Sequence, residues 1–139
     1  MELLIKIIPA LVLGSMLFFS IAIAPKIFTV LSNEEAGKFV RSIFPTYYKY
    51  NGFQYLILTI LMLYTEKSGN ILYISIFILF LFISSNYFLM PLINKSRDVN
   101  NQKRFKILHL MSVVINFLII IFSVLLLLLI HWEKNIIYI

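Results

Sequence analysis

The chain is 139 residues long, and 61% of its residues are hydrophobic while only 13% are charged. Soluble domains carry about 25% charged and about 45–50% apolar residues, so this chain lacks the polar side chains that would coat a water-exposed surface. The composition therefore argues against a soluble enzyme, a nucleic-acid-binding domain and a disordered chain. The absence of cysteine excludes disulfides, thiolate metal sites and cysteine nucleophiles.

Four segments of the chain are predicted to span a membrane. A spanning helix needs about 20 mostly apolar residues to cross about 30 Å of hydrocarbon. Strands of a membrane barrel would alternate apolar and polar residues, and these segments do not alternate. The expected fold is all-α, an integral membrane four-helix bundle in one domain. Its predicted spans are residues 3–24, 46–65, 70–92 and 106–130.

The first of these segments has an alternative interpretation as a signal peptide. Ala22, Ile23 and Ala24 resemble a small-x-small cleavage site. The apolar run is longer than the roughly 7–15 residues of a typical signal sequence. Pro25 would also follow the cut directly, where its ring hinders a peptidase. Cleavage would leave three spans.

An amphipathic helix is predicted over residues 33–44, between the first two spans. Ser32 and Glu35 have the spacing of a capping box, which starts a helix, and Pro45 is expected to end it. The segment is too short to span and is expected to lie in the membrane interface. The alternative is a helix of a soluble loop packed on the bundle. Its apolar stripe comprises Ala36, Phe39, Val40, Ile43 and Phe44.

The positive charge of the chain predicts its orientation. The first and third connections, with the adjoining helix edges, hold nine of the twelve basic residues. Basic loops stay in the cytoplasm, so both termini are expected on the other side. The predicted location is a bacterial inner membrane. The net charge of +6 is thus explained without a nucleic-acid partner.

Motifs for catalysis are missing from the sequence. It has no glycine-rich phosphate loop and no HExxH motif. No predicted span carries an acidic residue at its centre, which leaves no buried carboxylate pair for acid–base chemistry. A non-enzymatic role is therefore favoured, with no metal site and no cofactor predicted.

Polar side chains of the predicted spans gather in the half nearest the basic connections. His109, Ser112 and Asn116 share one face of the fourth helix. Polar groups in lipid must pair or meet water, so they are expected to converge in a polar cavity open to the cytoplasm. Alternatively, these residues only bridge helices. The candidate ligand-binding residues, with two arginines for an anionic group, are His109, Ser112, Asn116, Asn86, Tyr47, Asn51, Arg41 and Arg97.

Short stretches spread from about residue 11 to residue 117 resemble the transmembrane protein 205-like family. They include the run from Phe18 to Pro25, the Phe44-Pro45 pair before Tyr47 and Tyr48, and a later set with Leu108 and His109. The resemblance implies a small four-helix membrane protein and does not imply an activity. It also implies that one recurring pattern contains Pro25, Pro45, Tyr47, Asn86, Arg97, His109 and Asn116.

The leading functional hypothesis is a protein that binds a small anionic or amphipathic ligand, or a lipid headgroup, from the cytoplasmic side. Its expected partners are membrane lipids and possible further copies or other subunits. One alternative is a redox protein with His109 as an axial haem ligand. His131 lies about 33 Å along the same helix, which excludes a bis-histidine haem within one subunit. Another alternative is a structural or assembly subunit of a larger membrane complex.

The orientation predicts the behaviour of a reporter fused after Ile139. Because nine basic residues lie on one side and three on the other, the fusion should be active only on the non-cytoplasmic side. Paired alkaline phosphatase and green fluorescent protein fusions measure this directly. Fluorescence of the second fusion without activity of the first would reverse the orientation.

Overall fold

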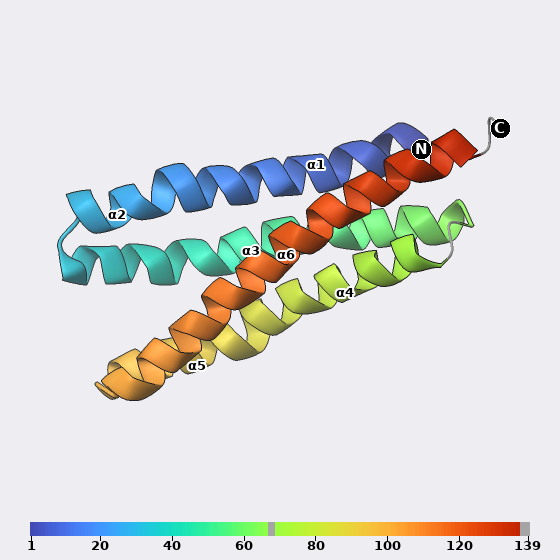
Figure 1. The fold of residues 1–139 in the computed structure, drawn as a ribbon. Coiled ribbons are helices and arrows are strands. Elements are labelled where there is room, and N and C mark those ends of the chain that lie inside the picture. The colour runs from blue at the N-terminus through green and yellow to red at the C-terminus, as the bar shows by residue number, and fades with distance from the viewer. Residues whose placement is uncertain (67–68, 137–139) are drawn as a thin grey trace.

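A computed structural model of the chain describes residues 1–66 and 69–136, with side chains as far as Trp132, and this part of the chain is helical throughout apart from short turns (Figure 1). The all-α prediction is therefore confirmed for the described residues. The helices form four rods. In chain order they are α1 (Glu2–Phe18), the π-helical turn η1 (Phe19–Ile23) and α2 (Ala24–Val30); α3 (Asn33–Tyr64); α4 (Asn70–Ser84), the π-helical turn η2 (Ser85–Leu89) and α5 (Met90–Asp98); and α6 (Gln102–Ile136).

The four rods make two helical hairpins of similar design. The first arms, α1 to α2 and α4 to α5, are 29 residues each, and the second arms, α3 and α6, have 32 and 35 residues. Both hairpin turns lie at one end of the bundle, and the N-terminus and the end of α6 lie at the other (Figure 1). The end with the turns carries nine basic and three acidic residues and is called the basic end below.

A side chain caps the second arm of each hairpin. Ser32 Oγ accepts the backbone N–H of Glu35, and the Glu35 carboxylate accepts the backbone N–H of Ser32, so the predicted capping box is confirmed. Hydrogen bonds from the Ser32 hydroxyl and N–H hold the pKa of Glu35 below its ordinary value. At the second turn, Asn101 Oδ1 accepts the N–H of Arg104 at 3.0 Å.

Proline explains the two π-helical turns of the first arms. Pro25 and Pro91 have no N–H to donate, and a proline ring clashes with the carbonyl four residues earlier. Each proline lies two residues after the end of a five-residue π-helical turn, η1 or η2, and such wider turns are found where a helix is interrupted. Both rods therefore continue through their prolines and change their winding at the level of the site described below.

The predicted helix end at Pro45 is wrong. Residues 33–44 and the predicted span from 46 belong to one continuous helix, α3, with Pro45 inside it. A proline removes a single hydrogen bond, and a long helix tolerates that loss when its neighbours hold both halves in place. Here α3 packs on α1, α2, α4 and α5. The helical rod that contains the predicted span 70–92 likewise extends further, since α5 continues to Asp98.

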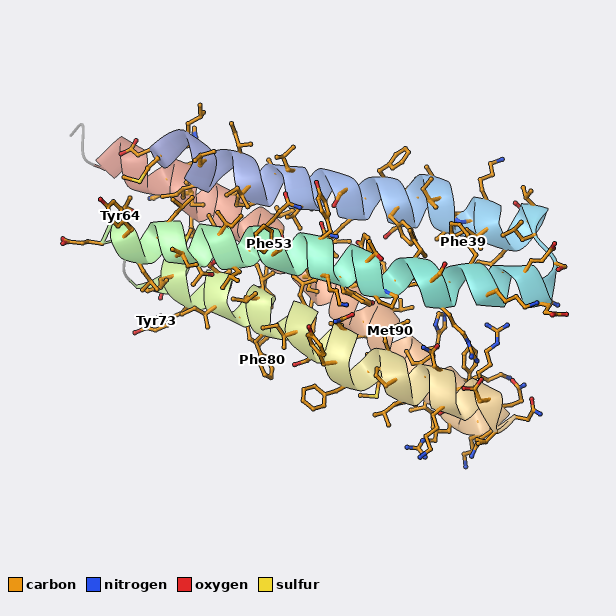
Figure 2. All side chains as sticks on the ribbon, turned by 180° about the vertical axis from the view of Figure 1, so that it is seen from behind. Phe39, Phe53, Tyr64, Tyr73, Phe80 and Met90 are labelled. Carbon is orange, nitrogen blue, oxygen red and sulfur yellow. The ribbon has the colours of Figure 1, made fainter. Side chains whose placement is uncertain are left out.

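Three of the four rods are long and apolar enough to cross a membrane: Glu2–Val30, Asn70–Asp98 and Gln102–Trp132. Large apolar side chains also cover the outside of the bundle, as Phe53 and Phe80 illustrate in Figure 2. A soluble helical protein would bury such side chains instead of exposing them on every face. These features mark the chain as a membrane protein.

The remaining rod, α3, is less apolar, and its inner face hydrogen-bonds to all three other rods. Its buried positions recur every three or four residues, as expected for one face of a helix. Polar groups away from water need partners, and small hydroxyls and amides on facing helices supply them. The pairs are Asn51 with Ser15 of α1 at 2.8 Å, Thr59 with Ser75 of α4 at 2.8 Å, and Tyr48 with Asn116 and Tyr55 with Ser123 of α6 at 3.2 and 2.7 Å.

The path of α6 separates the two hairpins at the basic end. Its backbone lies against α1 towards the chain termini and against α5 at the basic end, as its diagonal course in Figure 1 shows. Within the described residues it does not approach the backbone of α2, η1 or α3. Among the described residues, the hydrogen bonds that join α3 to α6 come from the long side chains of Tyr48 and Tyr55. The hairpins are therefore packed together at one end and diverge at the other.

The hydrogen bond between Tyr55 and Ser123 is expected to stabilise the bundle, so the effects of replacing the two residues should depend on each other. Ser123→Ala leaves a buried tyrosine hydroxyl without a partner and should cost about 1 kcal/mol of unfolding free energy. Tyr55→Phe should cost a similar amount. The double variant should be no worse than either single one, because it orphans no group. Thermal unfolding of the four proteins in detergent measures the cycle, and strictly additive losses would contradict the pairing.

Candidate functional site

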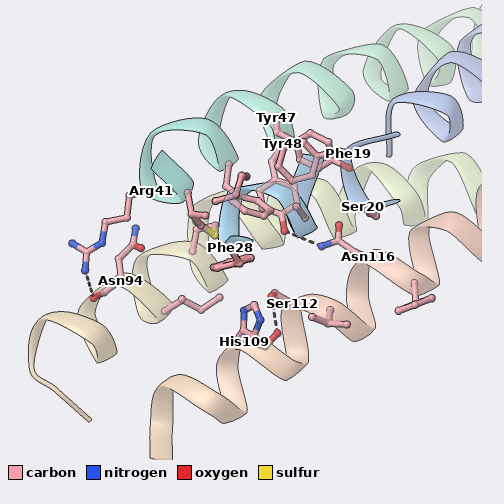
Figure 3. Close-up of a pocket in the computed structure, with 18 of the residues that line it drawn as sticks. Phe19, Ser20, Phe28, Arg41, Tyr47, Tyr48, Asn94, His109, Ser112 and Asn116 are labelled. Atoms are coloured by element: carbon pink, nitrogen blue, oxygen red, sulfur yellow. Dashed lines mark hydrogen bonds between the residues drawn. The ribbon is translucent and has the colours of Figure 1, made fainter. Parts of the chain in front are cut away.

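A pocket of about 660 Å³ lies where the two hairpins diverge (Figure 3). The end of α1, η1 and α2 form one wall, and α6 forms the opposite wall. The first half of α3 and the α5 segment close the space between them. The lining residues are Leu17, Phe19, Ser20, Ile21, Ala24, Ile27, Phe28, Val40, Arg41, Phe44, Tyr47, Tyr48, Met90, Ile93, Asn94, Arg97, Phe105, His109, Ser112, Val113, Asn116, Phe117 and Ile120.

The α6 wall carries the polar groups of the pocket. The Ser112 hydroxyl donates to the backbone carbonyl of His109 at 2.7 Å, so it is already satisfied within the helix. The imidazole of His109 stacks on the ring of Phe105, with their planes 3° apart and their centroids 5.8 Å apart. Asn116 Nδ2 donates to the hydroxyl oxygen of Tyr48 at 3.2 Å (Figure 3). This bond involves the amide nitrogen of Asn116 and not its carbonyl oxygen.

That Asn116 carbonyl oxygen, Oδ1, is buried and has no hydrogen-bond partner among the described residues. Buried amide oxygens in proteins are nearly always paired, because an unpaired one costs roughly 1–3 kcal/mol. It is one of three such buried side-chain atoms among the described residues, with Gln54 Nε2 and Ser85 Oγ. Of these three residues, Asn116 is the one that lines the pocket, where a bound molecule can reach its oxygen. A hydroxyl or amide donor on such a molecule would satisfy Oδ1.

Aromatic rings form the α3 side of the pocket. Phe19 of η1 packs against Tyr47 with ring centroids 4.9 Å apart, and Phe44 packs against Tyr48 at 5.7 Å. Tyr47 and Tyr48 meet each other edge to face at 5.5 Å. Most other lining residues are aliphatic or aromatic. The predicted polar cavity is thus a largely apolar pocket with one polar wall, because the first hairpin arm contributes almost only apolar side chains.

Two arginines mark the basic end of the pocket. Arg41 of α3 forms a 2.5 Å ion pair with Asp98 of α5 and lies 3.5 Å from the backbone carbonyl of Asn94. Arg97 of α5 donates to the backbone carbonyl of Asn33 at 3.1 Å. These bonds join the start of α3 to the end of α5. They therefore close the gap between the hairpins beyond the pocket.

The structure brings six of the eight predicted candidates together in this lining: His109, Ser112, Asn116, Tyr47, Arg41 and Arg97. Asn51 is fully buried elsewhere, where it accepts from Ser15 Oγ and donates to the Tyr47 carbonyl at 3.0 Å. Asn86 is half-buried in η2 and does not line the pocket. These two candidates therefore lie outside the lining of this pocket. A ligand role for the other six stays a prediction.

Sequence reasoning missed the apolar half of the site. Phe19, Ile27 and Phe28 line the pocket but look like ordinary residues of a spanning helix. The signal that could have found them is Pro25, since a proline in a span indicates a local change of winding. Nothing in the sequence indicates that α6 diverges from this segment.

The part of the chain that the structure describes contains no group of three histidine, aspartate or glutamate side chains placed to hold a metal ion. His109 and His131 lie towards opposite ends of α6. The ring of His109 faces Phe105 and the pocket. The pocket can bind the apolar part of a ligand, form hydrogen bonds to it from α6, and place positively charged side chains beside it at one end.

Fold and pocket together define a small all-helical membrane protein with a pocket between two hairpins. The chain belongs to the family described as Domain of unknown function (DUF4149), whose model matches residues 7–102. The match does not extend to the transmembrane protein 205-like family in particular, and it ends before the three candidates on α6. No curated protein and no solved structure matches the chain.

The geometry predicts different roles for two asparagines that look alike in the sequence. Asn51→Leu removes a fully buried bridge between α1 and α3 and should lower the melting temperature markedly. Asn116→Leu removes one 3.2 Å bond and an unpaired oxygen, and the Tyr48 hydroxyl that loses its partner lies in the lining of the pocket, so this variant should melt closer to the wild type. Thermal unfolding in one detergent compares them, and an equal or reversed order would contradict the assignment.

Proposed function

We propose that the protein is a non-enzymatic, multi-pass membrane protein that binds an amphipathic small molecule or lipid in the pocket between α2 and α6. The observation that carries the proposal is the pocket itself. It has about 660 Å³ of space, mostly apolar walls, one polar wall and a charged end. Binding sites for small molecules commonly have this volume and this balance of apolar surface with a few polar groups.

The pocket opens sideways through apolar residues. Ile21, Phe28 and Phe117 line it, and 73, 63 and 62% of their surfaces are exposed. On a membrane protein, exposed apolar side chains at a spanning helix face acyl chains rather than water. A ligand that is itself dissolved in the membrane can therefore enter between α2 and α6 without crossing a polar barrier.

In the proposed arrangement, all four rods span the membrane and the basic end faces the cytoplasm. A helix of 32 residues is about 48 Å long, which exceeds the roughly 30 Å of hydrocarbon. The basic end then extends into the headgroup region. Lys26, Lys95 and Lys106, which lie near the basic ends of α2, α5 and α6, mark the expected boundary. The start of α3, predicted as an interfacial helix, would lie beyond it as part of the longer helix.

The pocket crosses that boundary. Ile120 and Leu17 lie at its apolar end, and Arg41 and Arg97 lie at its charged end. An amphipathic molecule in a membrane has the same polarity gradient, with chains in hydrocarbon and a polar group at the interface. The match in direction supports an amphipathic occupant over a wholly polar or wholly apolar one.

The test compares two pocket variants with a matched histidine control. His109→Ala and Asn116→Leu should reduce the amount of lipid-like molecule that co-purifies with the protein, because both side chains line the pocket. His131→Ala removes a histidine from the other end of α6 and should change nothing. Mass spectrometry of the purified proteins quantifies the bound molecule, and thermal unfolding reports the fold.

Loss of the fold in step with loss of the bound molecule in both variants would reduce these residues to helix bridges. A wild-type protein that carries no molecule above the detergent background would overturn the proposal. An absorbance spectrum of the same sample tests the haem alternative, which requires a Soret band that His109→Ala abolishes. Stable co-purification of a second polypeptide in mild detergent would instead favour the assembly subunit.

A further inference from the structure

The two arginines at the basic end of the pocket also line a second, smaller hollow. This hollow has a volume of about 230 Å³, and Glu34, Gly37 and Lys38 complete its lining. Arg41 and Arg97 therefore separate an apolar pocket from a polar hollow at the protein surface. Because one arginine comes from each hairpin, the pair exists only in the folded bundle.

The charges around this hollow are unequally paired. Lys38 forms a 2.7 Å ion pair with Glu34, and Arg41 pairs with Asp98. Arg97 bonds to a backbone carbonyl and has no carboxylate partner among the described residues. These five side chains, two acidic and three basic, therefore have a net charge of +1, and the unpaired charge is that of Arg97.

Glycine at position 37 lets the Arg97 guanidinium lie directly against α3. A Cβ added to Gly37 would collide with all the terminal atoms of that guanidinium. The guanidinium is thus held over the α3 backbone, although the arginine as a whole is exposed. A planar group fixed in this way presents its N–H fork to an oxyanion, the use for which arginine is best suited.

The position of this charge suits one part of an amphipathic molecule. The arginine pair lies at the charged end of a pocket whose other end is apolar and open to acyl chains. In a membrane, the anion that stands directly above acyl chains is the phosphate of a phospholipid. A phosphodiester carries one negative charge, which equals the net charge at the hollow.

We infer that the ligand of the pocket is a phosphate-bearing lipid, whose phosphate binds Arg97 and Arg41 while an acyl chain occupies the space between α2 and α6. The inference rests on the proposed function and names the chemical class of its ligand. Arg97 supplies the main contact because its charge is free. Arg41 adds a second guanidinium that is already positioned by Asp98.

The experiment uses the full chain, delipidated in dodecyl maltoside, and four probes. Dimyristoyl phosphatidylglycerol carries both phosphate and chains, and dimyristoylglycerol carries the chains alone. Glycerol 3-phosphate carries the phosphate alone, and dimyristoyl phosphatidylcholine adds a compensating positive charge. Native mass spectrometry measures apparent affinities. Phosphatidylglycerol should bind about tenfold more tightly than dimyristoylglycerol, and glycerol 3-phosphate should bind much more weakly than either lipid.

Arg97→Gln should remove the preference for phosphatidylglycerol, about a tenfold loss of affinity, and leave dimyristoylglycerol binding unchanged. Arg97→Lys keeps the charge without the planar guanidinium, so its affinity for phosphatidylglycerol should lie between those of the wild type and Arg97→Gln. Arg104→Gln removes an arginine from the same end that lines neither hollow, and it should behave as wild type. Arg97 is the better position to test because Arg41→Gln would also strip Asp98 of its ion pair.

The possible outcomes separate the two proposals. Equal binding of phosphatidylglycerol and dimyristoylglycerol, unaffected by Arg97→Gln, would overturn the phosphate site but not the lipid pocket. Binding of glycerol 3-phosphate as tight as phosphatidylglycerol, and lost in Arg97→Gln, would show a site for free phosphate and overturn the lipid assignment. An equal loss in Arg104→Gln would reduce the effect to general surface charge. Failure of every lipid to bind would overturn the proposed function itself.

Discussion

The structure depends on the hydrogen bonds that α3 makes to the other three rods. Unpaired polar side chains are costly on a membrane helix, and α3 carries more polar side chains than its neighbours. Two tyrosines seven residues apart, Tyr48 and Tyr55, reach α6 at Asn116 and Ser123, which are also seven residues apart. Because a tyrosine side chain is long, these bonds hold α6 without drawing its backbone against α3. The space left beside the Tyr48 bond is the pocket.

Proline shapes the opposite wall of that space. Pro25 follows η1, and the altered winding directs Phe19 towards Tyr47 and leaves Phe28 at the pocket. The second hairpin repeats the device with Pro91 and η2. The chain therefore uses one hairpin design twice, and the pocket arises because the two copies diverge at the basic end. Neither copy contains the pocket by itself.

Charge gives this pocket a direction. The basic end holds all of the formal net charge of +6, since the rest of the chain carries three basic and three acidic residues. Within this end, most charges beside the pocket are neutralised by neighbours, and Arg97 is not. The basic end as a whole attracts anionic lipids, and beside the pocket the unneutralised positive charge is that of the Arg97 guanidinium. That combination suits a lipid phosphate better than a soluble anion, because a soluble anion has no acyl chain to pack against the apolar walls.

The sequence alone determined the class of this protein, because hydrophobic composition, run length and the placement of charge depend only on the order of residues. The Ser32–Glu35 cap was predictable for the same reason, since its partners are three residues apart. The tertiary structure decided what depends on distant neighbours. Packing on both halves carried α3 through Pro45, and helix winding sent Asn51 to Ser15 while Asn116 faced the pocket. The apolar walls and the Arg41–Arg97 pair also come from segments far apart in the chain, which only the divergence of the hairpins brings to one site.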